Sequence, residues 1–263
     1  MEMEIFTNVT GIFIRKREQQ DKLAIWFVHG FGESGFCFKE AFDAPELKQY
    51  SLHVPDFPGF GVSPLFSESH TINQSASLLT DLIKDSHNPV VLVAHSLGGL
   101  IATQAATALP EKVKGLVNVE GNLTKADCFY SGKAAEATNA AQFKADFTEE
   151  IYKMGLKDEA IRRYFVSLKM ANPESLKTWG RTGVEATGEE KGGNDFLQVP
   201  CPKLYIYGKK SIPERSRKFL EKNDVEAVEF ENSGHWPMLD ETEKFYRVVG
   251  EFVSNLIERK TEL

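Results

Sequence analysis

Apolar and polar residues alternate along the chain in short blocks that predict strands separated by helices. Runs rich in valine, isoleucine and leucine predict the strands, and the alanine-rich residues 100–109 have helical spacing. The predicted strands span residues 5–15, 24–29, 51–55, 90–95, 113–120, 203–207 and 225–230. Thr10-Gly11 in the first of them predicts a hairpin. Strands that alternate with helices predict a mostly parallel sheet with helices on both faces.

The strand pattern stops between residues 122 and 198. Helical spacing predicts helices at residues 134–154, 157–170 and 173–181. Residues 183–194 contain four glycines and three glutamates, which predict a mobile return loop. We therefore expect a core domain built from residues 1–121 and 199–263, with residues 122–198 inserted as a helical segment.

One short segment, Val93-Ala94-His95-Ser96-Leu97-Gly98-Gly99, stands where a predicted strand runs into a predicted helix. The chain must reverse sharply there, and Ser96 lies at the apex. Ala94, Gly98 and Gly99 are small enough to let the strand and helix backbones approach closely. A serine on such a strained turn has its hydroxyl directed outward, as a nucleophile requires.

Three further strands end in segments with candidate chemistry. The strand at 24–29 runs into His29-Gly30-Phe31-Gly32-Glu33-Ser34, where two glycines let bare backbone face a ligand. The strand at 225–230 leads to Ser233-Gly234-His235-Trp236, so His235 comes last in chain order. The strand at 51–55 is followed by Asp56-Phe57-Pro58-Gly59, and we interpret Asp56 as structural.

Together these segments resemble the α/β-hydrolase superfamily, in its serine-hydrolase type. The turn at Ser96 is similar to the nucleophile elbow of that superfamily, with Ala94 in place of the usual first glycine. The resemblance implies a mostly parallel eight-stranded α/β sheet flanked by helices, with residues 122–198 as a helical cap after the sixth strand. It also implies Ser96 as nucleophile, His235 as base, and the Phe31 and Leu97 N–H groups as an oxyanion hole.

The acid of the implied triad departs from the common pattern. Ser211 stands where the superfamily commonly has aspartate, and it follows two lysines, Lys209 and Lys210. A neutral hydroxyl cannot offset the positive charge that develops on His235, so another carboxylate must do so. Glu120 stands at the C-terminal end of the predicted strand at 113–120, a position from which some members of the superfamily take their acid.

Strand spacing also favours Glu120. If the His235 loop follows the eighth strand, the sixth strand lies two spacings away, about 10 Å, and the seventh about 5 Å. The additional methylene of a glutamate helps to span the longer distance. Glu214 is the main alternative acid, and a surface pair with Lys125 is the alternative role for Glu120.

Composition and charge narrow the class of partner. A net charge of −7 without a long basic run argues against nucleic acid and anionic lipid. The acidic start Met1-Glu2-Met3-Glu4, with no apolar run of membrane-spanning length, favours a cytoplasmic location. The three cysteines, widely spaced and without a zinc-ligand pattern, predict reduced and mostly packed thiols: Cys37, Cys128 and Cys201. Oligomeric state is left open.

The function that the sequence predicts is hydrolysis of an ester-like bond of a small molecule through an acyl-enzyme, as in a carboxylesterase. This chemistry needs no metal or organic cofactor. The predicted cap is rich in aromatic residues, among which we name only Phe129 as a candidate substrate contact.

Other functions use the same triad and remain alternatives. They are C–C bond hydrolysis, thioester hydrolysis and the reactions of cofactor-free haloperoxidases or perhydrolases. A receptor-like ligand-binding protein with slow turnover is the alternative from a different class.

Overall fold

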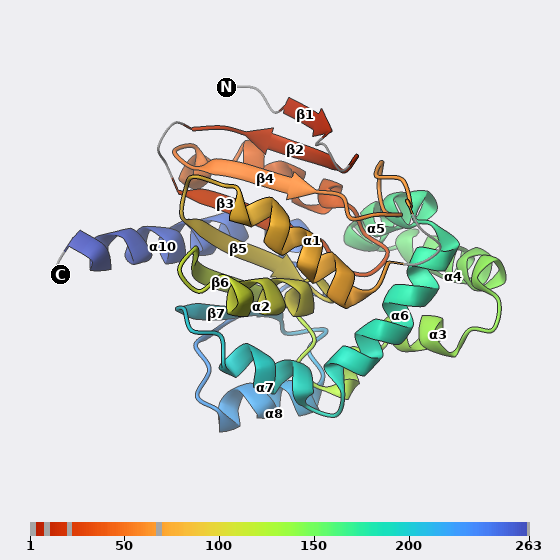
Figure 1. Cartoon of the computed structure of the whole chain (residues 1–263). Coiled ribbons are helices and arrows are strands. Elements are labelled where there is room, and N and C mark those ends of the chain that lie inside the picture. The colour runs from red at the N-terminus through yellow and green to blue at the C-terminus, as the bar shows by residue number, and fades with distance from the viewer. Residues whose placement is uncertain (1–3, 8–10, 20–22, 67–69, 262–263) are drawn as a thin grey trace.

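An eight-stranded sheet runs through the centre of the computed structural model (Figure 1). The structure describes residues 4–7, 11–19, 23–66 and 70–261. The strands are β1 (Glu4–Thr7), β2 (Phe13–Arg17), β3 (Ala24–Val28), β4 (Ser51–Pro55), β5 (Val90–His95), β6 (Val113–Val119), β7 (Lys203–Gly208) and β8 (Ala227–Phe230).

The strands lie in the order β1-β2-β4-β3-β5-β6-β7-β8. β2 pairs antiparallel with β1 and β4, and the remaining neighbours pair in parallel. The predicted α/β fold with a mostly parallel sheet is thus confirmed. β1 and β2 are the strands of the predicted hairpin, whereas Thr10 lies outside the described residues. Because β5, β6 and β7 are parallel neighbours, their carboxyl ends meet at one edge of the sheet.

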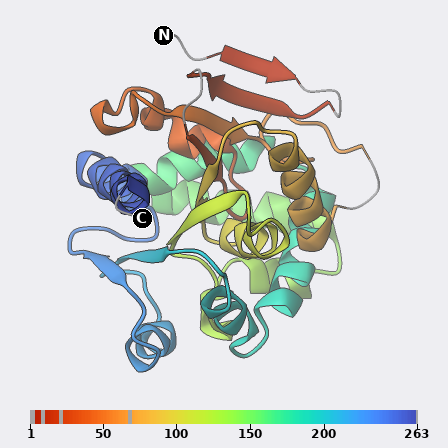
Figure 2. The same cartoon turned by 60° about the vertical axis from the view of Figure 1, so that its left-hand side comes forward.

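Helices cover both faces of this sheet (Figure 2). α1 (Ile72–Lys84) and α2 (Gly98–Ala108) pack together on one face, and α10 (Thr242–Thr261) lies on the other. Every residue of β3 and β5 is buried, as expected for strands covered on both sides. The shorter helices of the core are α8 (Glu214–Lys222) and α9 (Pro237–Asp240), and 3₁₀ turns span Gly35–Phe42, Pro45–Leu47 and Lys125–Asp127.

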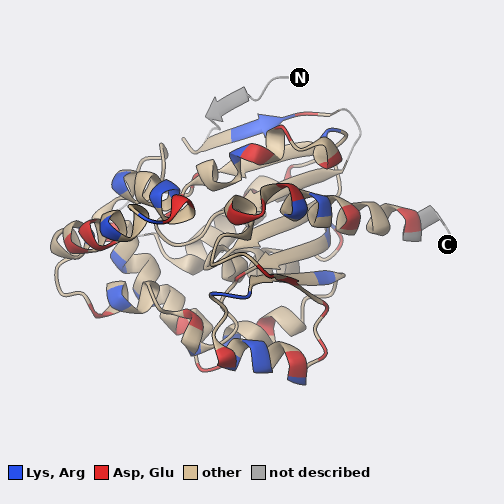
Figure 3. Cartoon of the chain, turned by 180° about the vertical axis from the view of Figure 1, so that it is seen from behind, with Lys and Arg blue, Asp and Glu red and all other residues tan. Residues whose placement is uncertain are grey.

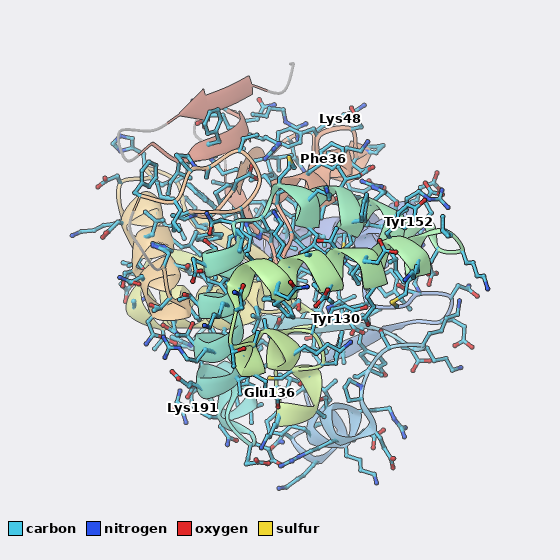
Figure 4. The ribbon with its side chains drawn as sticks, turned by 90° about the vertical axis from the view of Figure 1, so that its right-hand side faces the viewer. Phe36, Lys48, Tyr130, Glu136, Tyr152 and Lys191 are labelled. Atoms are coloured by element: carbon cyan, nitrogen blue, oxygen red, sulfur yellow. The ribbon has the colours of Figure 1, made fainter. Side chains whose placement is uncertain are left out.

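Five helices separate β6 from β7 in the chain: α3 (Ser131–Glu136), α4 (Ala140–Gly155), α5 (Glu159–Met170), α6 (Pro173–Thr187) and α7 (Lys191–Leu197). The first four lie beyond the carboxyl ends of the parallel strands (Figure 1). Figure 4 looks onto them from that side, with Tyr130 labelled close to α4. We propose that residues 122–198 form a cap over this edge of the sheet.

The mobile loop predicted for residues 183–194 is wrong, because most of this segment is helical. α6 extends to Thr187, and α7 begins at Lys191. The glycines serve close packing: a Cβ atom on Gly183 would lie 2.8 Å from Leu97 Cδ1. A glycine there lets α6 approach the residue that follows Ser96, so the cap packs directly on the turn.

The helix predicted at residues 134–154 is two helices, α3 and α4. Asn139 ends the connection between them, because its side chain accepts a hydrogen bond from Gln142 N at 2.9 Å and so caps α4.

Acidic and basic residues are interspersed over the elements that face the viewer in Figure 3. Within the described ranges, no helix is both long and apolar enough to cross a membrane. The cysteines are free thiols, of which Cys37 and Cys128 are buried. Asp56 has the structural role expected of it, since it is buried and pairs with Arg15 at 2.7 Å.

Candidate active site

Ser96 stands on the sharp turn between β5 and α2. Its φ of 53° lies in the left-handed region, which is strained for a residue other than glycine. The sheet ladder continues up to the turn, because Ser96 N donates to Val119 O at 2.9 Å. Two glycines make room: a Cβ atom on Gly30 would lie 2.8 Å from Ser96 Cβ, and one on Gly98 2.6 Å from His29 O. The close approach of the backbone at this turn therefore explains why the residues around Ser96 are small.

Two buried backbone amides lie in the same cavity as Ser96. Phe31 and Leu97 are 5% and 1% exposed, and neither N–H donates a hydrogen bond to another described residue. Buried N–H groups are nearly always paired, so an unpaired couple indicates a place for an acceptor from a ligand. Leu97 also stands at the N-terminus of α2, where the helix dipole favours negative charge.

Glu120 and His235 form a close pair, with 3.0 Å between Glu120 Oε2 and His235 Nδ1. Glu120 directly follows β6, has a φ of 50° and is 5% exposed. Its other oxygen, Oε1, accepts hydrogen bonds from Gly208 N at 2.7 Å and from Ser211 Oγ at 3.0 Å. The carboxylate is therefore held at one oxygen and faces the histidine with the other.

Ser211, at the position where aspartate is common, supports the carboxylate of Glu120. The lysines before it do not oppose the pair, because Lys209 Nζ binds Glu231 and Lys210 Nζ donates to Asn232 O.

The alternatives to this arrangement lie elsewhere. Glu214 is exposed and pairs with Lys218 at 2.7 Å. Lys125 pairs with Glu189 at 3.2 Å instead of with Glu120.

The contact with Glu120 determines which ring nitrogen of His235 carries the proton. Nδ1 faces a carboxylate and therefore carries the proton, which leaves Nε2 as the basic nitrogen. Burial lowers the pKa of His235 below its usual value, against the opposing effect of the hydrogen bond to Glu120. The ring is thus neutral near pH 7. Ser96 Oγ forms no hydrogen bond with the described residues, His235 included, which is common before substrate binds.

Ser96 and His235 line one small cavity of about 10 Å³ between the sheet edge and the proposed cap. That is room for about one water molecule. The aromatic wall of the cavity is formed by Phe129, Tyr130, Tyr164 and Trp236.

Phe129, the candidate substrate contact, lies in this wall, and its ring is 5.0 Å from the His235 ring in an edge-to-face arrangement. Tyr164 of α5 was not distinguished by sequence from the other cap aromatics. It is 3% exposed, and its hydroxyl has no hydrogen-bond partner among the described residues. A Cβ atom on Gly32 would lie 2.6 Å from that hydroxyl, so the oxygen sits over the loop that holds Phe31.

Sequence reasoning also missed a second buried carboxylate. Glu33 is 2% exposed and accepts hydrogen bonds from Gly30 N and Trp236 Nε1, each at 2.6 Å. Its Oε2 lies 2.9 Å from Nδ1 of His95. The available signal was a glutamate inside a glycine-rich segment that directly follows a buried strand.

The cavity wall contains no cysteine among the described residues, and Cys37 lies behind Glu33, with Sγ 3.8 Å from Oε2. Nor does the described part of the chain bring together three or more His, Cys, Asp or Glu side chains that could hold a metal ion.

Comparison with known proteins identifies the family of this chain. A family model described as the alpha/beta hydrolase family matches residues 27–248. The chain belongs to the alpha/beta hydrolase family. The matched span runs from β3 into α10, so it includes the turn at Ser96, Glu120 and the loop that carries His235.

This alpha/beta hydrolase is similar to the pimeloyl-[acyl-carrier protein] methyl ester esterase of Legionella pneumophila. The two are 27% identical over 235 residues, covering 86% of this chain and 92% of the relative. A thermophilic esterase from Thermogutta terrifontis has a TM-score of 0.76 at 19% identity, covering 97% and 99% of the two chains. An esterase from Exiguobacterium antarcticum has a TM-score of 0.73 at 18% identity, covering 95% and 98%. The likeness to these two structures supports the fold.

Proposed function

We propose that this alpha/beta hydrolase is a serine esterase, which cleaves an ester-like bond of a small molecule through an acyl-enzyme. Ser96 is the nucleophile, His235 the general base and Glu120 the acid of the triad. The observation that carries the proposal is the 3.0 Å contact between Glu120 and His235 Nδ1 at the cavity that contains Ser96. Relatives of this chain named as esterases support the same reaction class.

In the acylation step, His235 Nε2 takes the proton of Ser96 Oγ as that oxygen attacks the carbonyl carbon of the ester. The carbonyl oxygen becomes an oxyanion and accepts hydrogen bonds from Phe31 N and Leu97 N. Glu120 stabilises the imidazolium of His235. The imidazolium then protonates the leaving alcohol, and the bond between the carbonyl carbon and the alcohol oxygen breaks.

In the deacylation step, His235 takes a proton from water as the water oxygen attacks the acyl-enzyme carbonyl. The same two amides hold the second oxyanion. Collapse of this intermediate breaks the bond to Ser96 Oγ, which recovers its proton from His235. The carboxylic acid product then leaves. No step needs a redox partner.

The substrate class is argued from the cavity. Its aromatic wall suits an apolar acyl chain. The Legionella relative is named for a methyl ester, which points to a small leaving alcohol. We therefore propose short-alcohol esters as the first substrates to test, with the acyl group both free and attached to an acyl carrier.

The proposal is tested by labelling with a fluorophosphonate, read by intact mass. We expect one label on the wild-type protein and none on Ser96→Ala. Ser131→Ala is the matched control, because Ser131 lines the same cavity and that variant should keep the label. A folded wild-type protein that takes no label would contradict an activated Ser96.

Turnover then separates an esterase from a binding protein. Nitrophenyl esters of increasing acyl length give the chain-length optimum, and methyl esters test the preferred alcohol. Enzymes commonly turn over at about 1 to 10³ per second. Turnover below about one per minute on every ester, with labelling intact, would favour the receptor-like alternative.

A further inference from the structure

A second buried Glu–His pair lies directly behind the proposed catalytic histidine. His95 precedes Ser96 at the end of β5 and is fully buried. Its Nδ1 lies 2.9 Å from Glu33 Oε2, and its Nε2 lies 2.7 Å from the backbone oxygen of His235. Both ring nitrogens of His95 therefore face an oxygen at hydrogen-bond distance.

The hydrogen bonds fix how many protons the His95 ring holds. A backbone carbonyl oxygen only accepts, so Nε2 must carry a proton. On the other side, Glu33 already accepts from Gly30 N and Trp236 Nε1, which indicates an ionised carboxylate. Nδ1 must then carry a proton as well. A neutral imidazole has a single N–H, so the two contacts together require an imidazolium.

We propose that His95 is a permanent imidazolium, which with Glu33 holds the backbone of His235 in place and opposes a second positive charge on the His235 ring. His95 and Glu33 are positioning residues, since they act through His235 and the oxyanion loop. The inference rests on the base role proposed for His235.

The position of the pair allows it to act on the His235 side chain. The two histidine rings are 4.7 Å apart between centroids, in a region from which water is largely excluded. Like charges at this distance repel strongly where the dielectric is low. The positive charge of His95 adds to burial in lowering the pKa of His235, and Glu33 raises the pKa of His95 despite its burial.

Other titratable groups also face the cavity. Glu120 is bound to Nδ1 of His235 and favours its charged form. Asp127 of the 3₁₀ turn lines the cavity, and burial raises its pKa to about 6. Tyr130 and Tyr164 of the proposed cap line it too, and burial raises the pKa of both phenols, so they stay neutral.

Glu33 and His95 also connect three loops whose relative positions the proposed chemistry requires. Glu33 holds Gly30 of the oxyanion loop and Trp236 of the histidine loop, and His95 adjoins the nucleophile. Glu33 and Trp236, which lie 203 positions apart in the chain, are thus joined by one hydrogen bond.

The sign of the effect on rate follows from the mechanism. Acylation needs His235 neutral, so kcat/KM falls as pH drops through the pKa of that ring. A fixed positive charge beside it moves the fall to lower pH. Removing the charge should therefore move the acid limb of the profile to higher pH.

The first test reads the charge without using activity. We would measure the ring nitrogens of the full-length protein by ¹⁵N NMR from about pH 5 to about pH 9, which brackets the ordinary pKa of histidine. The His95 signals are assigned by their loss in His95→Gln. Two protonated nitrogens on His95 throughout are expected, and a ring that titrates within the range overturns the proposal.

The second test is the pH profile of His95→Gln, whose amide keeps a donor for the His235 carbonyl. We expect the acid limb of kcat/KM for a nitrophenyl ester to move up by about one pH unit or more. An acid limb that stays in place while kcat falls would assign His95 a purely structural role and overturn the charge effect. Repeating both profiles in an Asp127→Asn background removes the other carboxyl that titrates near this range.

Two further variants keep the test falsifiable. His53→Gln makes the same change at a partly buried histidine, which stacks on Trp26 and lines a separate hollow, and should leave the limb unchanged. If His95→Gln does not fold, Glu33→Gln should produce a smaller upward shift, because His95 loses the carboxylate that keeps it charged while the opposing effect of Glu33 on the pKa of His235 is lost as well. Failure of fluorophosphonate labelling would reject the base role of His235, whereas the NMR result stands independently of it.

Discussion

The ends of β6 and β7 lie side by side, yet they carry different chemistry. β6 ends in Glu120, whose carboxylate contacts His235, whereas β7 leads to Ser211, whose hydroxyl donates to that same carboxylate. The strand nearer to β8 thus supplies a hydrogen-bond donor, and the strand farther away supplies the charge. The comparison teaches that the end of one strand can support a carboxylate at the end of its neighbour, which is the arrangement that the proposed triad requires.

Of the variants at these two strand ends, Glu120→Gln should lower kcat the most. The amide cannot balance the charge that develops on His235, and if its NH₂ faces Nδ1 it stabilises the wrong tautomer. We expect kcat for a nitrophenyl ester to fall by about 10⁴ with little change in KM. Steady-state kinetics on a variant with wild-type circular dichroism is the measurement, and a variant that keeps more than a tenth of its activity would reject Glu120 as the acid.

Adding Ser211→Asp to Glu120→Gln should return the acid to the strand end where the superfamily commonly has it. The new carboxylate lies one strand closer to β8, so it can approach the His235 loop. We expect recovery of about 10² in kcat, which is incomplete because His235 is now oriented for β6. Ser211→Asn in the same background is the matched control, since it adds similar volume without charge. Equal recovery by both would show that charge is not what is restored.

Ser211→Ala should have a smaller effect, because Glu120 keeps its bond from Gly208 N at 2.7 Å. Loss of one hydrogen bond to a charged group costs about 1.5 to 3 kcal/mol at most, and only part of it falls on the transition state. We expect about a tenfold decrease in kcat, restored in Ser211→Thr. A decrease as large as that of Glu120→Gln would mean that Ser211 itself belongs to the triad.

Glu214→Gln should have the least effect, less than about twofold on kcat/KM, since exposed pairs contribute little. Its carboxylate pairs with Lys218 on the surface of α8. The same kinetic assay measures it. A large loss of kcat/KM would indicate that the acid of the triad follows β7 and that Glu120 has the supporting role.

The elements of the comparison differ in how far the sequence could predict them. Glu120 was predictable, because a carboxylate that directly follows a buried strand must lie at the edge of the sheet. The role of Ser211 was not, since a serine after Gly208 has the pattern of any turn. Only the fold brings its hydroxyl to 3.0 Å from Glu120.

The same limit explains the remaining failures. Gly183 and its neighbours have a loop composition, and only the contact with Leu97 shows that they pack helices closely. Glu33 binds Trp236 across most of the chain, and no local pattern marks such a pair. Strands and turns were predictable because each depends on residues that are adjacent in the sequence. These contacts depend instead on where the whole fold places its side chains.

The small cavity at Ser96 has a consequence for kinetics. With room for about one water molecule, it is too small for an ester, so the proposed function requires side chains such as Phe129 and Tyr130 to move aside. Under that proposal every turnover begins with an opening event, and such motions commonly take microseconds to milliseconds. For reactive esters this event limits the rate of capture, so substrates with very different leaving groups should converge on one ceiling of kcat/KM. That ceiling would measure how often the protein opens and would be independent of how fast Ser96 attacks.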